Sequence, residues 1–162
     1  MSFNVLILCT SNSARSVMSE AILNKRGKGR FKAYSAGSKP AGIVDPVGAK
    51  LLAGKGYDMS AYSSKSWDVF AGADAPKMDV VITVCDNAAG ETCPVWPGMP
   101  LQMHWGFPDP ATTEGSEEEK LASFSAIYDA IDVYMEKLVA LPVETMDQNS
   151  LKAAMRAIAE VE

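Results

Sequence analysis

Histidine and cysteine, which supply most metal centres and disulfide frameworks, are scarce in this sequence. The 162 residues include one histidine and three cysteines. The histidine, His104, has no second ligand near it in sequence, so we expect it to make a structural hydrogen bond and expect no catalytic metal. Three is an odd number, and in a chain interpreted as cytosolic it favours redox or catalytic cysteines over a disulfide framework.

The beginning of the chain has no long apolar run. Its first residues contain no basic leader, and the apolar stretch ends at Cys9, which is too short for a signal peptide core or a membrane span. We therefore expect a cytoplasmic protein with no membrane partner. Basic residues are in the minority, 15 against 20 acidic ones, and the net charge of -5 argues against nucleic acid as a partner. An anionic substrate would need a local positive site.

Segments with strand and helix periodicity alternate along the chain, without internal repeats or low-complexity linkers. The expected strands span residues 4–8, 31–36, 79–84 and 101–105, and the expected helices span residues 16–25, 45–54 and 117–138. This alternation predicts an α/β fold with a small, doubly wound, four-stranded parallel sheet flanked by helices. Ligands bind such sheets beyond the carboxyl ends of the strands, so the residues after Leu8, Val84 and Trp105 should face one site.

The expected helix over 117–138 has a continuous apolar stripe, and Ser116 with Glu119 predicts a capping box at its start. After a stop at residues 141–142, a tail helix is predicted, with Thr145 and Gln148 at its opening and Leu151, Met155 and Ile158 on its apolar face. We expect a main domain over residues 1–140 and a helical extension over residues 141–162 packed on the same domain.

A loop suited to oxyanions lies between the first strand and the first helix. Cys9 stands at the strand end, Arg15 six positions later at the helix start, and small polar residues lie between them. Such a loop turns backbone N–H groups inward beside a helix N-terminus, which makes a concave site for a tetrahedral oxyanion. The expected oxyanion-binding residues are Thr10, Ser11, Asn12, Ser13, Ala14 and Arg15.

Cys9 is the expected nucleophile of this loop. The planar fork of Arg15 matches two oxyanion oxygens. The field of the loop should lower the pKa of the Cys9 thiol from about 8.5 towards roughly 3.5–7.5, and Ser16 could donate a hydrogen bond to the thiolate. Asn12 tolerates left-handed backbone angles and is expected to brace the loop. The alternative, that Cys9 is a small hydrophobe at a buried strand end, leaves Arg15 and the turn residues unexplained.

The loop resembles the C-x5-R-S signature of low-molecular-weight tyrosine phosphatases and of the arsenate reductases related to them. Further stretches similar to the arsenate reductases are Tyr34-Ser-Ala-Gly37, Ser64-Lys-Ser-Trp-Asp68, Val81-Ile-Thr-Val-Cys-Asp-Asn-Ala-Ala-Gly90, Cys93-Pro-Val-Trp-Pro-Gly98 and His104-Trp-Gly-Phe-Pro-Asp-Pro110. The resemblance covers most of residues 3–140. It implies the phosphatase fold and reduction of arsenate to arsenite, with no tightly bound cofactor.

Thiolate attack on an oxyanion must expel an oxygen, which leaves poorly unless it is protonated. Asp109 is the best candidate for the acid, because it follows an expected strand end between two prolines and matches the Asp-Pro acid of the family. A plain Asp-Pro turn is the alternative. Asp86, beside Cys85, is a weaker rival.

Cys85 directly follows an expected strand, and Cys93 lies eight residues later. Arsenate reduction needs a second thiol to attack the sulfur of the Cys9–arsenic adduct, whereas phosphocysteine hydrolysis does not. The resemblance implies that Cys85 attacks Cys9, that Cys93 then attacks Cys85, and that an external thiol reduces the resulting disulfide. In the thioredoxin-coupled members the two resolving cysteines are one residue closer together, so thioredoxin and glutathione with glutaredoxin both remain open as the transient partner. A buried core thiol at Cys85 and a bystander at Cys93 are the alternatives.

Two other functions compete with arsenate reduction. A tyrosine phosphatase would use the same Cys9, Arg15 and Asp109, but the tyrosines that commonly follow the family's Asp-Pro are replaced here by Ala-Thr-Thr-Glu. A phosphocarrier or binding module would leave Asp109 and the two further cysteines without a purpose.

Finally, three residues resemble positions at which some family members hold a monovalent cation: Asn12, Glu20 and Ser35.

Overall fold

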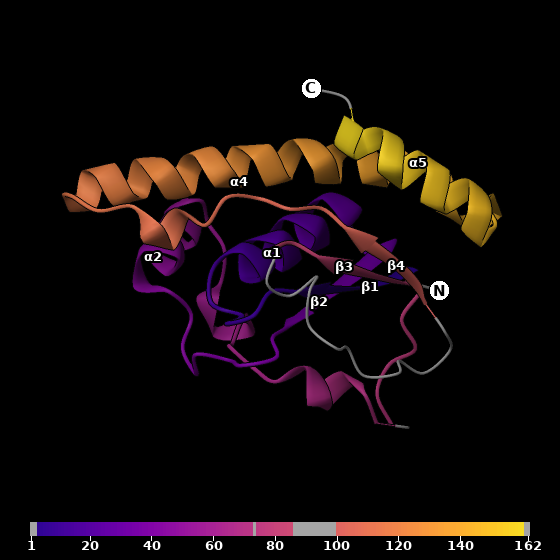
Figure 1. The fold of residues 1–162 in the computed structure, drawn as a ribbon, viewed down its shortest axis with the longest axis horizontal. Helices are drawn as coiled ribbons and strands as arrows, with labels where there is room; N and C mark the ends of the chain where they lie inside the picture. The colour runs from indigo at the N-terminus through magenta and orange to yellow at the C-terminus, as the bar shows by residue number, and fades with distance from the viewer. Residues whose placement is uncertain (1–2, 73, 86–99, 161–162) are drawn as a thin grey trace.

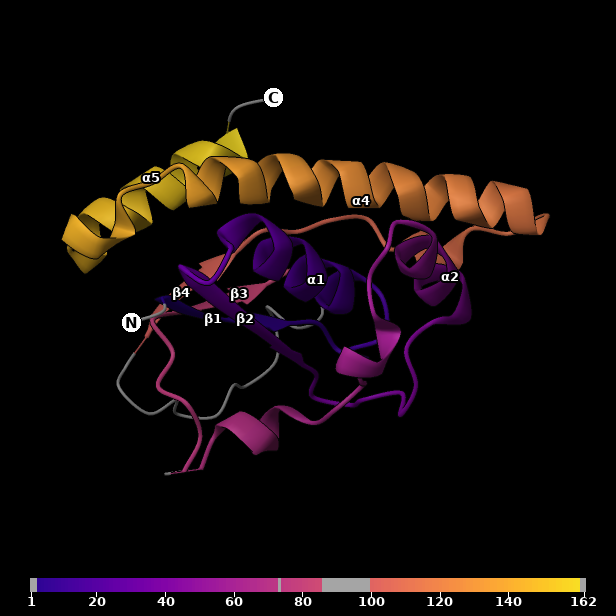
Figure 2. The same ribbon diagram turned by 180° about the vertical axis from the view of Figure 1, so that it is seen from behind.

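The computed structural model describes residues 3–72, 74–85 and 100–160 and has the predicted α/β architecture. The strands are β1 (Phe3–Leu8), β2 (Phe31–Ala36), β3 (Val80–Thr83) and β4 (Leu101–His104), and the helices are α1 (Arg15–Gly27), α2 (Pro46–Gly54), α4 (Glu117–Val139) and α5 (Gln148–Glu160). Four 3-10 turns join them: η1 (Met59–Ala61), η2 (Trp67–Phe70), η3 (Pro110–Thr112) and η4 (Val143–Thr145). Figures 1 and 2 show α4 and α5 as the outermost layer on one side, with α1 between α4 and the sheet.

The four strands are parallel and lie in the order β2-β1-β3-β4. The order reverses at β1, because the chain runs from β1 to β2 on one side and then returns to pair β3 on the other. Leu8 is level with Thr83 across the β1–β3 pair, so the residues that follow these two strands emerge side by side. This reversal is the topological switch point at which parallel sheets bind ligands.

Each face of the sheet carries its own core. The larger core joins β1, β3 and β4 to α1, α4 and α5 and includes Cys9, Trp105 and Phe107. On the opposite face, Leu6, Leu8 and other apolar side chains pack with Phe70 of η2. The four-stranded parallel sheet flanked by helices is confirmed, and in the described residues its second face is covered by a 3-10 turn.

The start of α4 is confirmed, whereas the predicted start of α5 is wrong. Ser116 and Glu119 form the capping box at α4, each accepting a hydrogen bond from the backbone N–H of the other. At α5, Asp147 caps the helix instead, because its carboxylate accepts from the N–H of Ser150 at 2.7 Å. Thr145 lies in η4, and its hydroxyl donates to the carbonyl of Pro142 at 3.0 Å.

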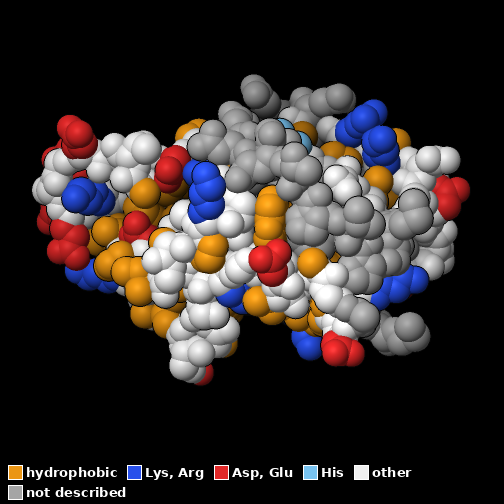
Figure 3. All heavy atoms as spheres, turned by 60° about the horizontal axis from the view of Figure 1, so that its bottom comes forward, with side chains coloured by type: hydrophobic (Ala, Val, Ile, Leu, Met, Phe, Trp, Pro, Cys, Tyr) orange, Lys and Arg blue, Asp and Glu red, His pale blue; other side chains and the backbone are white. Residues whose placement is uncertain are grey.

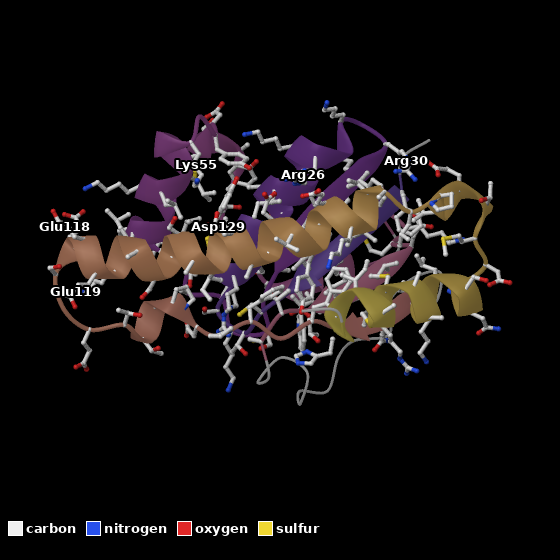
Figure 4. All side chains as sticks on the ribbon, turned by 90° about the horizontal axis from the view of Figure 1, so that it is seen from above. Arg26, Arg30, Lys55, Glu118, Glu119 and Asp129 are labelled. Carbon is white, nitrogen blue, oxygen red and sulfur yellow. The ribbon has the colours of Figure 1, made fainter. Side chains whose placement is uncertain are left out.

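The chain between α4 and α5 is held by Arg30, a residue that the sequence motifs did not single out. Its guanidinium donates to the Val139 carbonyl at 2.6 Å and to the Leu141 carbonyl, and pairs with Glu144. Figure 4 labels Arg30 close to the turn between the two helices. The predicted apolar face of α5, Leu151, Met155 and Ile158, is buried in the larger core. Within the described segments, no helix is both long and apolar enough to cross a membrane.

Candidate active site

The loop after β1 turns its carbonyl groups outward. Backbone N–H groups from the segment after β2 donate to three loop carbonyls: Lys39 to Thr10 (2.9 Å), Ala41 to Ser11 (2.9 Å) and Asp45 to Ser13 (2.8 Å). None of the N–H groups of residues 11–14 donates to another described residue. With the carbonyls bonded on the outside, these N–H groups are left for an acceptor on the inside of the loop.

Helix α1 begins at the end of this loop without the usual cap. Ala14 is at the N-cap position, no side chain caps the helix, and its first turn has no acidic residue. No described side chain therefore caps the N–H groups at this helix start, where the partial positive charge of the helix lies. On the face shown in Figure 3, Lys and Arg side chains are scattered instead of forming one patch. The helix N-terminus and Arg15 are the positive elements at this loop.

Asn12 braces the loop from below, as predicted. Its backbone is left-handed (φ 46°), and its side chain is fully buried. The Asn12 amide accepts from the N–H of Lys65 at 2.8 Å and donates to the hydroxyl of Ser16 at 2.8 Å. Ser16 therefore accepts one hydrogen bond from Asn12, and its own O–H remains available as a donor.

Gly37, at the end of β2, lies against the outside of the loop. A Cβ at this position would be 2.4 Å from the Thr10 carbonyl oxygen and 2.5 Å from that of Cys9, both backbone atoms that cannot rotate away. Glycine is thus required by close approach of two backbones. Gly37 belongs to the motif Tyr34-Ser-Ala-Gly37, but the sequence alone does not show that the loop after β1 is the segment packed against it.

We expect Gly37→Ala to destabilise the protein by about 1–3 kcal/mol, the usual cost of inserting a methyl group into packed structure. The displaced loop should also bind oxyanions more weakly. Urea unfolding and phosphate protection of Cys9 from alkylation measure the two effects. Gly54→Ala is the matched control, because its Cβ would meet nothing within 4 Å. Equal stability of the two variants would contradict the requirement for glycine at position 37.

Arg15 and Asp109 are brought together across the mouth of the loop. Arg15 Nη2 lies 3.5 Å from Asp109 Oδ2, and Nη1 donates to the Phe107 carbonyl at 2.9 Å. The Arg15 side chain is 14% exposed and the Asp109 side chain 37%, so the pair lies at the protein surface with the arginine the deeper partner. Asp109 Oδ1 also accepts from the N–H of Ala111 at 2.9 Å. Phe107, which the sequence analysis did not propose as a site residue, orients the guanidinium through its carbonyl.

Cys9 and Cys85 meet at the switch point of the sheet. Both are buried and neither is in a disulfide. Their thiols are hydrogen-bonded to each other, and the Thr10 N–H donates to Cys85 Sγ at 3.4 Å. Thr10, expected to contact the oxyanion, therefore faces the two sulfur atoms. The second thiol that reduction chemistry requires is in contact with the first.

The expected lowering of the Cys9 pKa is not found. Hydrogen bonding to the Cys85 thiol raises the pKa of Cys9 above its ordinary value, and burial acts in the same direction. The charge of Arg15 and the Thr10 N–H lower it, as predicted, but they are outweighed. The sequence motif contains only the lowering groups, whereas the raising group comes from β3.

In Cys85→Ala we expect Cys9 alkylation to begin at lower pH. The substitution removes the largest influence that raises the Cys9 pKa, so the pKa falls and the thiolate fraction at a given pH rises. The iodoacetamide rate at Cys9, followed by peptide mass spectrometry, gives the pH midpoint. Cys93→Ser serves as the control. A midpoint at the same or higher pH in Cys85→Ala would show that the two thiols are not coupled.

The positions compared with a cation site lie together beneath the loop. Ser35 donates to the Glu20 carboxylate at 2.5 Å, and Asn12, Glu20 and Ser35 are all buried. Burial raises the pKa of Glu20, while Ser35 and the positive charge of Lys65 oppose this rise. Lys65 is itself partly buried, which lowers its pKa. A protein ammonium group thus supplies positive charge next to Glu20.

The remaining candidates play smaller parts or fall outside the described residues. His104 Nδ1 and Thr83 Oγ1 are 2.8 Å apart, so the predicted structural hydrogen bond is confirmed. The described residues contain no cluster of three or more His, Cys, Asp or Glu side chains suited to a metal. Cys93 and Asp86 lie outside the described residues.

Comparison with known proteins agrees with this geometry. The family model for low molecular weight phosphotyrosine protein phosphatase matches residues 4–153. Arsenate reductases from Bacillus licheniformis and Bacillus subtilis are 39% and 37% identical over 127 residues, which is 78% of this chain and 88% of each relative.

Solved structures of arsenate reductases have a similar fold. The crystal structure of an arsenate reductase from Archaeoglobus fulgidus has a TM-score of 0.64 and 29% identity, covering 85% of this chain and 99% of that one. The resemblance to arsenate reductases inferred from the motifs is therefore confirmed. The chain belongs to the low molecular weight phosphotyrosine protein phosphatase family.

Proposed function

We propose that this protein reduces arsenate to arsenite, with Cys9 as the nucleophile and Cys85 as the first resolving thiol. The observation that carries the proposal is the contact between the Cys9 and Cys85 thiols within an oxyanion-binding loop. Hydrolysis of a phosphocysteine uses no second thiol, whereas reduction of arsenate needs one to attack the sulfur of the Cys9–arsenic adduct. The arsenate reductases among the relatives point to the same reaction.

In the proposed mechanism, arsenate binds between the inward N–H groups of the loop and Arg15. The N-terminus of α1, which has no side-chain cap, adds a favourable field for the anion. The Arg15 guanidinium lies close enough to Asp109 and Phe107 to be held in one orientation at the loop mouth. A planar donor held in this way can bond two arsenate oxygens at once.

Cys9 then attacks arsenic. A sulfur–arsenic bond forms, and one oxygen leaves as water after Asp109 donates a proton to it. Cys9 must lose its proton to attack, and the Arg15 charge and the Thr10 N–H favour this loss against the Cys85 thiol and burial, which raise the pKa of Cys9. The Ser16 hydroxyl and the Thr10 N–H act as donors to the sulfur anion. Arsenic remains As(V) in this step.

The redox step follows when Cys85, as a thiolate, attacks the sulfur of Cys9. A Cys9–Cys85 disulfide forms, and the sulfur–arsenic bond breaks with its electron pair going to arsenic, which leaves as As(III) in arsenite. The two thiols have together lost two electrons, which balances the reduction. The sulfur atoms already lie next to each other, so this step needs no large rearrangement of β1 and β3.

Regeneration requires a third thiol and an external reductant. By resemblance to the family, Cys93 attacks Cys85, freeing Cys9 and transferring the disulfide to Cys85–Cys93. A transient dithiol partner, thioredoxin or glutaredoxin with glutathione, then reduces this disulfide. No tightly bound cofactor takes part in the scheme.

The proposal is tested by following reductant consumption with arsenate. NADPH oxidation is measured with thioredoxin and its reductase, and separately with glutathione, glutaredoxin and glutathione reductase, while p-nitrophenyl phosphate hydrolysis is followed in parallel. Arsenate-dependent NADPH oxidation in either system supports reduction and identifies the reductant. Phosphate ester hydrolysis with no arsenate-dependent oxidation would instead identify the protein as a phosphatase that uses Cys9, Arg15 and Asp109.

A further inference from the structure

One buried side chain connects the C-terminal helix to the segment that carries Asp109. Trp105 follows β4 directly, is 1% exposed, and donates from its indole N–H to the carbonyl of Met155 in α5 at 3.1 Å. Met155 is fully buried in the same core as Trp105. A buried indole N–H needs a hydrogen-bond partner, and here that partner belongs to α5.

From Trp105 the contacts continue to the active-site arginine. The N–H groups of Trp105 and Phe107 donate to the carbonyls at the end of β3, at 2.8 Å from Thr83 and 3.0 Å from Val84. The ring of Tyr134, in α4, packs edge-on against both Trp105 and Phe107, with centroids 5.3 and 4.9 Å away. The Phe107 carbonyl then accepts from Arg15.

Beyond Phe107 the acid loop continues into η3, whose Pro110 is buried. Asp109 contacts Arg15 and the N–H of Ala111, and Thr113 donates to Ser123 of α4 at 2.7 Å. Residues 106–112 are therefore held by α4 on one side, through η3 and Thr113, and by Trp105 on the other. The direction in which Asp109 points depends on both.

We propose that α5 positions the acid loop through Trp105, so that Trp105 acts on the reaction by way of Asp109. This inference rests on the proposed function, in which Asp109 donates the proton to the leaving oxygen. A small shift of a catalytic group costs rate in the step that it serves. Arsenate binding depends chiefly on the loop after β1, and the single bond from Arg15 to the Phe107 carbonyl links that site to α5, so binding should be affected less than proton transfer. Trp105 is thus a positioning residue whose loss should lower kcat more than it changes KM.

The test is a double-mutant cycle between Trp105→Phe and Asp109→Asn in the full chain. Phenylalanine keeps a ring against Tyr134 and removes only the N–H donor. We expect Trp105→Phe to lower kcat by about tenfold, less than the ~10²–10⁴-fold that a general acid contributes, with a smaller rise in KM for arsenate. In the Asp109→Asn background the same substitution should have little further effect, because the proton donor is already absent. Trp67→Phe, on the opposite face of the sheet, is the matched control and should keep wild-type kcat.

Two results would overturn the inference: a wild-type kcat in Trp105→Phe, or an equal loss of kcat in the presence and absence of Asp109. The second result would show that Trp105 merely supports the fold.

If wild type consumes no reductant with arsenate, the proposed function fails, and the cycle is replaced by hydrogen exchange of the wild-type chain with and without inorganic phosphate. Phosphate should then slow exchange in α5 near Met155, because the link between Arg15 and α5 works in both directions. Unchanged α5 exchange at saturating phosphate would contradict the link. If Trp105→Phe does not fold, hydrogen exchange of the wild-type chain with and without phosphate is the test of the link between α5 and Arg15.

Discussion

Replacing Cys85 by serine should reduce steady-state arsenate turnover by at least about 10³-fold, as loss of a residue that forms a covalent intermediate usually does. Serine is similar in size and can still bond the Thr10 N–H that now donates to Cys85 Sγ. It cannot attack the sulfur of Cys9, so reaction should stop at the Cys9–arsenic adduct. Reductant consumption measures the loss.

The same variant should keep its oxyanion site, because the loop carbonyls and Arg15 are held by residues other than Cys85. Phosphate should therefore protect Cys9 of Cys85→Ser from alkylation at concentrations similar to those for wild type. Arsenate turnover at the wild-type rate in Cys85→Ser would refute the role of this thiol. Loss of both turnover and phosphate protection would mean that Cys85 acts through the structure of the loop.

The second large effect is expected from Arg15→Lys. Lysine keeps the charge but has no planar fork, so it cannot bond two oxyanion oxygens while donating to the Phe107 carbonyl. Loss of one or two hydrogen bonds to a charged group, each about 1.5–3 kcal/mol, predicts a roughly 10–10⁴-fold weaker affinity for phosphate or arsenate. Isothermal titration with phosphate measures the change directly.

Arg26→Lys is the control for this substitution, because Arg26 forms a two-point ion pair with Asp132 at 2.5 and 2.8 Å, between α1 and α4. Figure 4 labels Arg26 where α1 adjoins α4. The control should bind phosphate as wild type does. An Arg15→Lys protein with wild-type affinity would show that the loop N–H groups alone hold the anion.

Local signals in the sequence were enough to predict much of this fold. The second strand was expected over residues 31–36 and spans Phe31–Ala36, and the capping box of Ser116 and Glu119 begins α4 where it was expected. Cys9 and Arg15 stand at a strand end and a helix start, as their spacing required. These features depend on residues that are close in the chain, which is why a single sequence reveals them.

Features that depend on distant residues could not be predicted. The raised pKa of Cys9 comes from Cys85, which the pairing of β1 with β3 brings into contact with it. The bond from Trp105 to Met155 crosses 50 positions, and its acceptor is a backbone carbonyl that no side-chain pattern marks. At α5, Thr145 was expected at the opening of the helix, whereas Asp147 forms the cap.

The central claim is that Cys9 and Cys85 together supply the two electrons that reduce arsenate. Its most direct test uses Cys93→Ser, fully reduced and mixed with one equivalent of arsenate in the absence of any reductant. Arsenite is quantified, and disulfides are mapped by mass spectrometry after acid quenching. The account predicts close to one arsenite per protein, together with a Cys9–Cys85 disulfide. Unchanged arsenate with both thiols free, or arsenite formed without that disulfide, would contradict it.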